Sequence, residues 1–276
     1  MSIKYAYLGP AATFTEAALI KISEKSDQLI AYANVTAALN SVRNGECQKA
    51  LVPIENSVEG VVARTLDELA IGEPLVITAE TTLPVTFSLM SLDKTNPNEI
   101  KSIATHPHAE AQCRSYIAKN FPYAQLIETS STAAAAKGLS KGDYDAAIAA
   151  PIAAKNYGLK VLAENIGDNQ GAVTRFVVVE KPGQTPAATG KDRTSLAVFI
   201  DIDHAGALLE ILNEFAKHQI NLTFIQSRPT GIELGHYHFI IDVEGHIDES
   251  GVSAALVGLK QICDDIRFLG SYPQAK

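Results

Sequence analysis

Short apolar runs, each followed by a polar turn and a stretch with helical spacing, recur through the first 160 residues. Residues 4–8 and 50–54 are two such runs. Apolar runs of four to eight residues bounded by turn residues are typical of buried strands. The residues after each turn have the apolar spacing of helices, and Thr13 with Glu16 has the spacing of a capping box. The pattern therefore predicts strands linked by crossover helices, as in α/β domains.

Residues 100–104 and 126–127 begin two further units of the same kind. All four turns between strand and helix carry hydroxyl, amide or carboxylate side chains. In a sheet with crossover helices these turns lie at the carboxyl ends of the strands, where helix N-termini offer free N–H groups to an anion. N-capping by Thr13, Asn56 or Ser131 explains each turn taken singly. The four turns together predict one polar pocket for a carboxylate or a phosphate.

A faint internal repeat predicts two similar lobes. Residues 36–54 are echoed by residues 132–152. The Val-, Ile- and Thr-rich segment 75–90 then crosses from one lobe to the other, and residues 161–179 return. The lobes are therefore expected over about residues 1–78 with 163–180 and over residues 79–162. A cleft between two lobes is a natural ligand site. Thr174 lies where the chain returns, so we expect it to face that cleft.

A second domain follows a segment with the composition of a linker, residues 181–193. Its apolar pattern predicts the order strand, helix, strand, strand, helix, strand, which is a ferredoxin-like βαββαβ sandwich. The expected elements cover residues 194–202, 207–218, 222–227, 237–243, 252–263 and 266–269.

Composition excludes several classes of partner. The chain has 276 residues, of which 46% are hydrophobic and 20% charged, and this size favours two globular domains. A net charge of -8 without a dense run of Lys and Arg argues against nucleic acid and anionic membranes. The start of the chain has no signal-peptide pattern and no segment is long enough to span a membrane, so a cytoplasmic location is expected.

Cys47, Cys113 and Cys263 are far apart and lack metal-ligand spacing. They are interpreted as reduced, mostly buried side chains. The histidines form no zinc pattern either. Neither a metal nor another cofactor is expected.

Five short motifs, in order along residues 3–180, resemble those of the prephenate dehydratase family. They are Gly9-Pro10 with Thr13-Phe14-Thr15, Val52 to Ser57, His106-Pro107 with Gln112-Cys113, Ser131-Thr132-Ala133, and Thr174-Arg175-Phe176. The resemblance implies a two-lobed fold similar to type 2 periplasmic binding proteins, with the active site between the lobes. It also implies conversion of prephenate to phenylpyruvate, water and carbon dioxide, without a cofactor, in phenylalanine biosynthesis.

The resemblance implies roles for particular residues. Thr174 is the catalytic hydroxyl, which we expect to hydrogen-bond the departing hydroxyl group of the substrate. Asn56 and Gln112 would orient the substrate, and Glu55 is the expected proton reservoir. The expected substrate-binding residues are Thr13, Phe14, Thr15, Ser57, Thr105, Ser130, Ser131, Arg175 and Phe176. Strand alternation puts Thr174 and Phe176 on one face and Arg175 on the other, so Arg175 reaches the substrate only if the backbone bulges.

The second domain resembles the ACT regulatory domain of the same family. That resemblance implies feedback inhibition by L-phenylalanine bound between paired domains, and hence a homodimer or a homotetramer. Gln226 stands where a Glu is usual, and His204 stands near a usual Pro. The expected effector-binding residues are Gly206, Ala207, Leu208, Leu209, Asn221, Gln226, Ser227, Arg228 and Pro229.

Two alternatives remain open from the sequence. The first is an arogenate dehydratase, which performs the same chemistry on the aminated substrate. The second is a non-catalytic anion-binding module with a sensor domain. The pair Ala11-Ala12, where many relatives have a Gly before the hydroxyl residue, leaves the shape of the first turn open.

Overall fold

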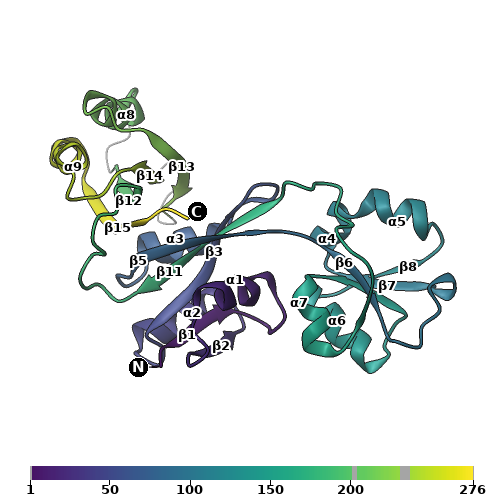
Figure 1. Ribbon diagram of the computed structural model, residues 1–276. Coiled ribbons are helices and arrows are strands. Elements are labelled where there is room, and N and C mark those ends of the chain that lie inside the picture. The colour runs from purple at the N-terminus through teal and green to yellow at the C-terminus, as the bar shows by residue number, and fades with distance from the viewer. Residues whose placement is uncertain (1, 201–203, 231–236, 276) are drawn as a thin grey trace.

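The computed structural model describes residues 2–200, 204–230 and 237–275, and it contains three sheets. Figure 1 shows the second sheet and its helices set apart from the first and connected to it by long extended segments. The third sheet, with its two helices, packs on the other side of the first. The predicted two-lobed α/β domain followed by a βαββαβ domain is confirmed.

The first lobe is built on six strands in the order β2-β1-β3-β11-β5, with β4 paired to β3. β1 runs parallel to β2 and β3, whereas β11 is antiparallel to both of its neighbours. The predicted lobe boundary at residue 78 falls inside β5. The strands are β1 Lys4–Leu8, β2 Gln28–Tyr32, β3 Lys49–Asn56, β4 Gly60–Val61, β5 Val76–Pro84 and β11 Val173–Glu180, and the helices are α1 Phe14–Ile22, α2 Val35–Arg43 and α3 Ala63–Ile71.

The second lobe has five strands in the order β10-β6-β9-β7-β8. Its helices pack through small side chains such as Ala133, Ala136 and Ala153, which lets them approach the sheet closely. The strands are β6 Ser88–Ser91, β7 Ser102–Thr105, β8 Gln125–Glu128, β9 Ala146–Ala149 and β10 Lys160–Ala163, and the helices are the 3-10 turn η1 Pro97–Glu99, α4 Pro107–Gln112, α5 Arg114–Asn120, α6 Thr132–Lys141 and α7 Pro151–Tyr157.

The third sheet has the strand order β13-β14-β12-β15, with the two helices on one face. Residues 201–202, the end of the first strand expected in this domain, lie outside the described residues. The elements are β12 Asp192–Phe199, α8 Ala207–Lys217, β13 Leu222–Pro229, β14 Tyr237–Glu244, α9 Ser250–Ile262 and β15 Asp265–Pro273.

β11 separates two environments because its side chains alternate. Phe176 and Val178 pack under α1 with Tyr7 and Leu19. The odd-numbered Val177 and Val179 face the opposite side, in the core formed with α2, α3 and the third sheet. The entry of β11 therefore presents successive side chains to two different parts of the molecule.

The third domain is fixed to the first lobe by a shared apolar core. Leu269 and Ile240 of the third sheet are in the same buried cluster as Ile77 and Val177. Gly270, with a φ of +141°, lies so close to β5 that an added Cβ would be 2.1 Å from the carbonyl oxygen of Ile77. This close approach requires glycine, and we call the contact between the two sheets the domain seam.

Within the ranges that the structure describes, no helix has the length and apolarity needed to cross a bilayer.

Candidate functional site

A pocket of about 260 Å³ lies between the two lobes, where the four polar turns meet. The turn after β1 contributes Phe14 and the end of β3 contributes Asn56. The other lobe contributes residues from the turn after β7 and α4, and from the turn after β8. Thr174 completes the wall. The lining residues are Phe14, Asn56, Val85, Phe87, His106, His108, Ala109, Gln112, Ser130, Ser131, Thr132 and Thr174.

The hydrogen bonds of Asn56 determine what Thr174 can do. The Asn56 Oδ1 atom accepts from the backbone N–H groups of Val58 and Glu59, at 2.8 and 2.9 Å. The Nδ2 group must then face Thr174, and it donates to the Thr174 Oγ1 atom at 2.7 Å. The hydroxyl of Thr174 is an acceptor in this bond. Its own proton therefore remains available for a group bound in the pocket.

Gln112 and His108 reach the first lobe through Glu59. Gln112 Nε2 donates to one Glu59 carboxylate oxygen at 2.9 Å, and His108 Nδ1 lies 3.5 Å from the other. Glu59 belongs to the same turn that holds Asn56 in place. One carboxylate thus joins the amide of Gln112 to the turn beside Thr174, across the opening between the lobes. Glu59 did not stand out in the sequence, where it is one acid in a polar turn.

His106 lines the pocket but was not among the expected site residues, although His106-Pro107 is one of the motifs named above. Its Nδ1 atom accepts from the backbone N–H of His108 at 3.3 Å and caps α4. Nε2 is then the protonated nitrogen of the neutral ring. Burial, together with nearby His108, lowers the pKa of His106. His106 therefore lines the pocket as a neutral N–H donor at physiological pH.

The donors that the pocket offers to an anion are neutral groups rather than Lys or Arg side chains. None of the described residues that line it is Lys or Arg. The first turn of α6 enters the wall at Thr132, and its N-cap Ser131 accepts from the N–H of Ala134 at 3.0 Å. The two N–H groups ahead of Ala134 have no intrahelical acceptor and lie at the positive end of the helix dipole. Backbone and amide donors can bind a carboxylate in such a site.

Several expected site residues lie beside the pocket but not in its wall. The Thr13 hydroxyl caps α1, Thr15 is buried in that helix, and the Ser57 hydroxyl accepts from the N–H of Val173. Thr105 donates to the carbonyl oxygen of Ile148 at 2.8 Å, between β7 and β9. The hydroxyl groups of Thr13, Ser57 and Thr105 each form a hydrogen bond to the backbone, and each bond holds a neighbouring segment of the chain in place.

Arg175, Phe176 and Glu55 are also placed away from the pocket wall. Phe176 is 1% exposed in the core under α1. Arg175 points to the domain seam, and the Glu55 carboxylate, which is 40% exposed, is 3.7 Å from its guanidinium group. The pairing of β11 with β3 does bulge, between Arg175 and Phe176, but Arg175 still faces the seam.

The expected effector residues lie at the start of α8 and along β13. Gly206 has a φ of +101° at the N-cap of α8, Ala207 is buried, and Leu209 is 59% exposed. Arg228 forms a bidentate ion pair with Asp67 of α3, with both distances 2.8 Å. The motif that carries Arg228 therefore contacts the first lobe directly.

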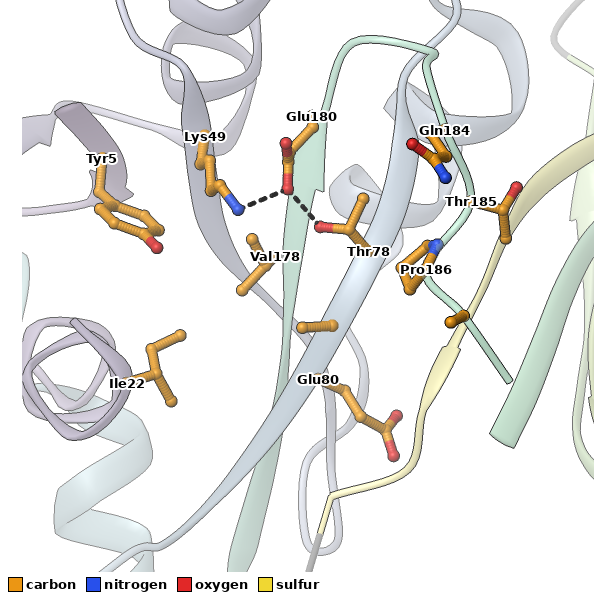
Figure 2. A pocket seen from close by; sticks show the side chains of 12 residues that line it. Tyr5, Ile22, Lys49, Thr78, Glu80, Val178, Glu180, Gln184, Thr185 and Pro186 are labelled. Atoms are coloured by element: carbon orange, nitrogen blue, oxygen red, sulfur yellow. Dashed lines mark hydrogen bonds and ion pairs between the residues drawn. The ribbon is translucent and has the colours of Figure 1, made fainter. Parts of the chain in front are cut away.

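A second, larger pocket of about 460 Å³ lies at the far end of β11, under the linker. Figure 2 shows the Lys49 ammonium group and the Thr78 hydroxyl both directed at Glu180, at 2.8 and 2.6 Å. The charges of Lys49 and Glu180 neutralise each other. None of the expected site residues lines this pocket. We therefore take the pocket between the lobes as the functional site.

Comparisons with known proteins identify the family of the chain. The family model described as prephenate dehydratase matches residues 5–184, and the ACT domain model matches residues 194–260. A prephenate dehydratase of Amycolatopsis methanolica is 45% identical over 273 residues, which cover 99% of this chain and 89% of the relative. The crystal structure of a prephenate dehydratase from Arthrobacter aurescens in complex with L-Phe is 49% identical, with a TM-score of 0.93 over 98% of this chain and 90% of that one.

Proposed function

The chain belongs to the prephenate dehydratase family, and from that premise we propose that its interlobe pocket converts prephenate to phenylpyruvate, water and carbon dioxide. Family membership supports this enzyme activity over a non-catalytic sensor and over the aminated substrate. We assign residues 1–180 to catalysis, 181–193 to the linker and 194–272 to regulation. The observation that carries the mechanism is the hydrogen bond from Asn56 to Thr174.

The reaction needs little from the protein beyond positioning. Prephenate has a ring carboxylate, a ring hydroxyl and a pyruvate side chain. When the ring carboxylate leaves as carbon dioxide, its electron pair enters the ring and expels the hydroxyl, which takes up a proton and leaves as water. The ring becomes aromatic, which supplies the driving force. The site must hold two carboxylates and hydrogen-bond the departing oxygen.

Thr174 is the donor to the departing hydroxyl. Because Asn56 occupies a lone pair of the Thr174 oxygen, the Thr174 proton is directed to a different acceptor. An alcohol is a weak acid, so Thr174 acts by hydrogen bonding and by relaying a proton rather than as an acid of matched pKa. Asn56 is catalytic in this arrangement because it sets the direction of that donor.

Neutral donors hold the two carboxylates. The first turn of α6, with Ser130 and Ser131 beside it, suits one carboxylate, and Gln112 and the N–H of His106 suit the other. Phe14 and Phe87, whose rings meet edge to face at 5.6 Å, form an apolar wall for the substrate ring. A dry wall beside the ring carboxylate favours the loss of its charge as carbon dioxide.

Residues outside the wall have supporting roles in this scheme. Glu55 lies near the guanidinium group of Arg175 and is more than a third exposed. It is positioned to exchange protons with solvent rather than to touch a dianion. Thr13, Thr15, Ser57, Thr105 and Phe176 hold the elements that form the pocket.

The third domain binds L-phenylalanine as a feedback inhibitor, and the complex named above, with L-Phe, supports this effector. β13, which carries the expected effector motif, is at the edge of its sheet. An exposed edge is suited to pairing with a second copy of the chain, so we propose a homodimer or a homotetramer. The free thiols of Cys47, Cys113 and Cys263 suit a reducing compartment, in keeping with the cytoplasm.

Incubation of the purified chain with prephenate at neutral pH tests the activity. Phenylpyruvate should form far above the spontaneous rate, and formation at the spontaneous rate would end the enzyme interpretation. A parallel incubation with arogenate discriminates between the two substrates. A higher kcat/KM for arogenate than for prephenate would show that the aminated compound is the substrate.

A further inference from the structure

Arg175 is the residue after Thr174, and its side chain crosses the domain seam. Its Nη2 atom is 2.7 Å from Asp242 Oδ2 on β14 and donates to the Tyr272 hydroxyl on β15 at 3.0 Å. Its Nε donates to Glu80 of β5 at 2.7 Å. Arg175 is 9% exposed. One guanidinium group therefore binds the catalytic sheet and the regulatory sheet together.

The partners in the regulatory domain form a chain of hydrogen bonds that the ion pair between Arg175 and Asp242 closes. Ser195 of β12 donates to Asp242 Oδ1 at 2.6 Å, so its oxygen accepts from the Tyr272 hydroxyl, also at 2.6 Å. Tyr272 in turn accepts from Arg175. Each hydroxyl donates once and accepts once, so the donors point in one direction, from Arg175 through Tyr272 and Ser195 to Asp242. Side chains on three of the four strands of the regulatory sheet, β12, β14 and β15, are thus linked to one guanidinium group.

Two carboxylates, those of Glu80 and Asp242, offset the two guanidinium groups of Arg175 and Arg193. Arg193 Nη1 is 2.9 Å from Glu80 Oε2, the same oxygen that binds Arg175. Figure 2 shows the carboxylate of Glu80 turned toward the C-terminal strand. The side chains of Glu80 and Asp242 are 3% and 1% exposed. A buried, paired group of this kind tolerates few alternative positions, because separation of one partner leaves an uncompensated charge.

We call Arg175, Glu80, Arg193, Asp242, Ser195 and Tyr272 the seam network. Burial opposes the charge of Arg175, but Asp242, Tyr272 and Glu80 raise its pKa, so it stays protonated. Burial and Asp242 likewise raise the pKa of the Tyr272 hydroxyl, which keeps its proton for Ser195. Arg175 therefore stays charged and Tyr272 stays neutral throughout the physiological range.

Thr174 cannot be displaced independently of Arg175. Their Cα atoms are joined by one planar peptide, about 3.8 Å long. On either side β11 is held by β3 and β5, where Thr174 pairs with Asn56 and with Leu83. The guanidinium group of Arg175 is held on several sides, so a shift of its partners that its side-chain torsions do not absorb strains or rotates this peptide and moves the hydroxyl of Thr174.

The expected effector motif is connected to the same network. Gln226 to Pro229 lie on β13, which pairs with β14 from Leu222 to Pro229. Asp242, on β14, pairs with Phe224. Arg228 also binds Asp67 on α3 of the first lobe. A change at the effector motif that shifts β13 will carry β14, and with it Asp242, across the seam.

We propose that Arg175 is a positioning residue through which the ACT domain controls the Thr174 hydroxyl. Resting on the proposed function, the inference is that effector binding shifts Asp242 and Tyr272 against β11, and that Arg175 transmits this shift to Thr174. Arg175 then serves the reaction from the seam without touching the substrate. The coupling between the effector site and the interlobe pocket is a free energy, and it can be measured.

The variants Asp242→Asn and Tyr272→Phe test the proposal in the full-length protein. The quantity to measure is the coupling factor, defined as kcat/KM without L-phenylalanine divided by kcat/KM at saturating L-phenylalanine. Allosteric factors are typically about 5- to 150-fold. Both variants should lower the factor at least about fivefold, toward one, while calorimetry still detects phenylalanine binding. Tyr272→Phe removes only a hydroxyl, so it keeps the test usable if Asp242→Asn folds poorly.

Arg267→Met provides the matched control. Arg267 donates to the carbonyl oxygen of Gly72 across the same seam and is not a member of the seam network. Its coupling factor should stay near that of the wild type. An unchanged factor in Tyr272→Phe, or an equal loss in Arg267→Met, would overturn the role of Arg175. Loss of phenylalanine binding in both network variants would place Asp242 and Tyr272 in the effector site. That result would also overturn the role of Arg175.

The same measurements separate this inference from the proposed function. Absence of prephenate turnover in the wild type removes the proposed function itself. Turnover that does not respond to phenylalanine leaves the enzyme assignment intact and overturns only the coupling role. A shift confined to KM or to kcat shows whether the network acts on substrate binding or on the chemical step.

Discussion

The two faces of β11 hold polar groups of opposite character. In the interlobe pocket, Thr174 and Asn56 are neutral and leave one donor unused. In the seam network, one residue further along, Arg175 is charged, buried and paired on several sides. A polar group with a spare donor beside a cavity is available for chemistry, whereas one whose partners are all protein groups holds structure together. Adjacent positions in one strand thus serve different purposes.

The largest expected effect is at the pocket face. Thr174→Val removes the free donor but keeps the shape of the side chain, so kcat should fall by about 10² to 10⁴-fold. Thr65→Val is the matched control, since Thr65 is also buried and its hydroxyl donates only to the carbonyl oxygen of Pro53. The control should lose about 1 kcal/mol of unfolding free energy and keep its turnover. Comparable losses of kcat in the two variants would show that Thr174 is structural.

A second variant tests the direction of the Thr174 hydroxyl. Asn56→Asp keeps an acceptor for the N–H groups of Val58 and Glu59 but replaces the Nδ2 donor with an oxygen. Thr174 would then donate to residue 56, and its proton would no longer be available to the substrate. We expect a loss of kcat of about 10²-fold. The double variant with Thr174→Val should lose little more than Thr174→Val alone, because both changes remove the same donor.

Additive losses in that double variant would contradict the orientation argument. They would mean that Asn56 and Thr174 act on different groups of the substrate. The comparison is made on kcat at saturating prephenate, because the added carboxylate also repels a dianion and raises KM.

The smallest expected effect is at His238, a buried group at the edge of the seam whose ring is not hydrogen-bonded within the part of the chain that the structure describes. His238 is 0% exposed and stacks on Phe199, and neither ring nitrogen has a hydrogen-bond partner among the described residues. Burial lowers the pKa of His238 below its ordinary value of 6.5, with Asp67 opposing and Arg228 adding to the shift. The folded protein therefore takes up this proton at lower pH than the unfolded chain.

Because the unfolded chain binds the proton first, His238 costs no additional stability above pH 6.5 and destabilises the fold as the pH falls below it. His238→Leu should raise the unfolding free energy by up to about 1 kcal/mol at pH 7, since it removes an unsatisfied polar group. Denaturant unfolding should show that the unfolding free energy falls less between pH 7 and pH 5 in the variant than in the wild type. An equal loss in both proteins would assign the acid sensitivity to other groups.

Local sequence patterns were sufficient for many of the elements and for the pocket as a meeting point of turns. The strands predicted at residues 4–8, 50–54 and 100–104 lie within a few residues of β1, β3 and β7, and Thr13 and Ser131 cap α1 and α6, whereas β2 was not predicted. Parallel strands end at one edge of each sheet, so the turns after β1 and β3 lie together in one lobe and those after β7 and β8 lie together in the other. The two lobes bring these pairs of turns together at the pocket. Alternation along β11 also separates Thr174 from Arg175, as the residues themselves predict.

Only the tertiary structure established which partner each side chain has. Arg175 binds groups 67 and 97 residues away, Asp242 and Tyr272, and Gln112 meets Glu59 across the lobes from 53 residues away. No local pattern specifies such pairs, because they depend on how separately formed sheets pack. The sequence therefore determined many of the elements, their polar ends and the alternation of Thr174 and Arg175, and the packing of three sheets decided which groups hold Arg175 at the seam.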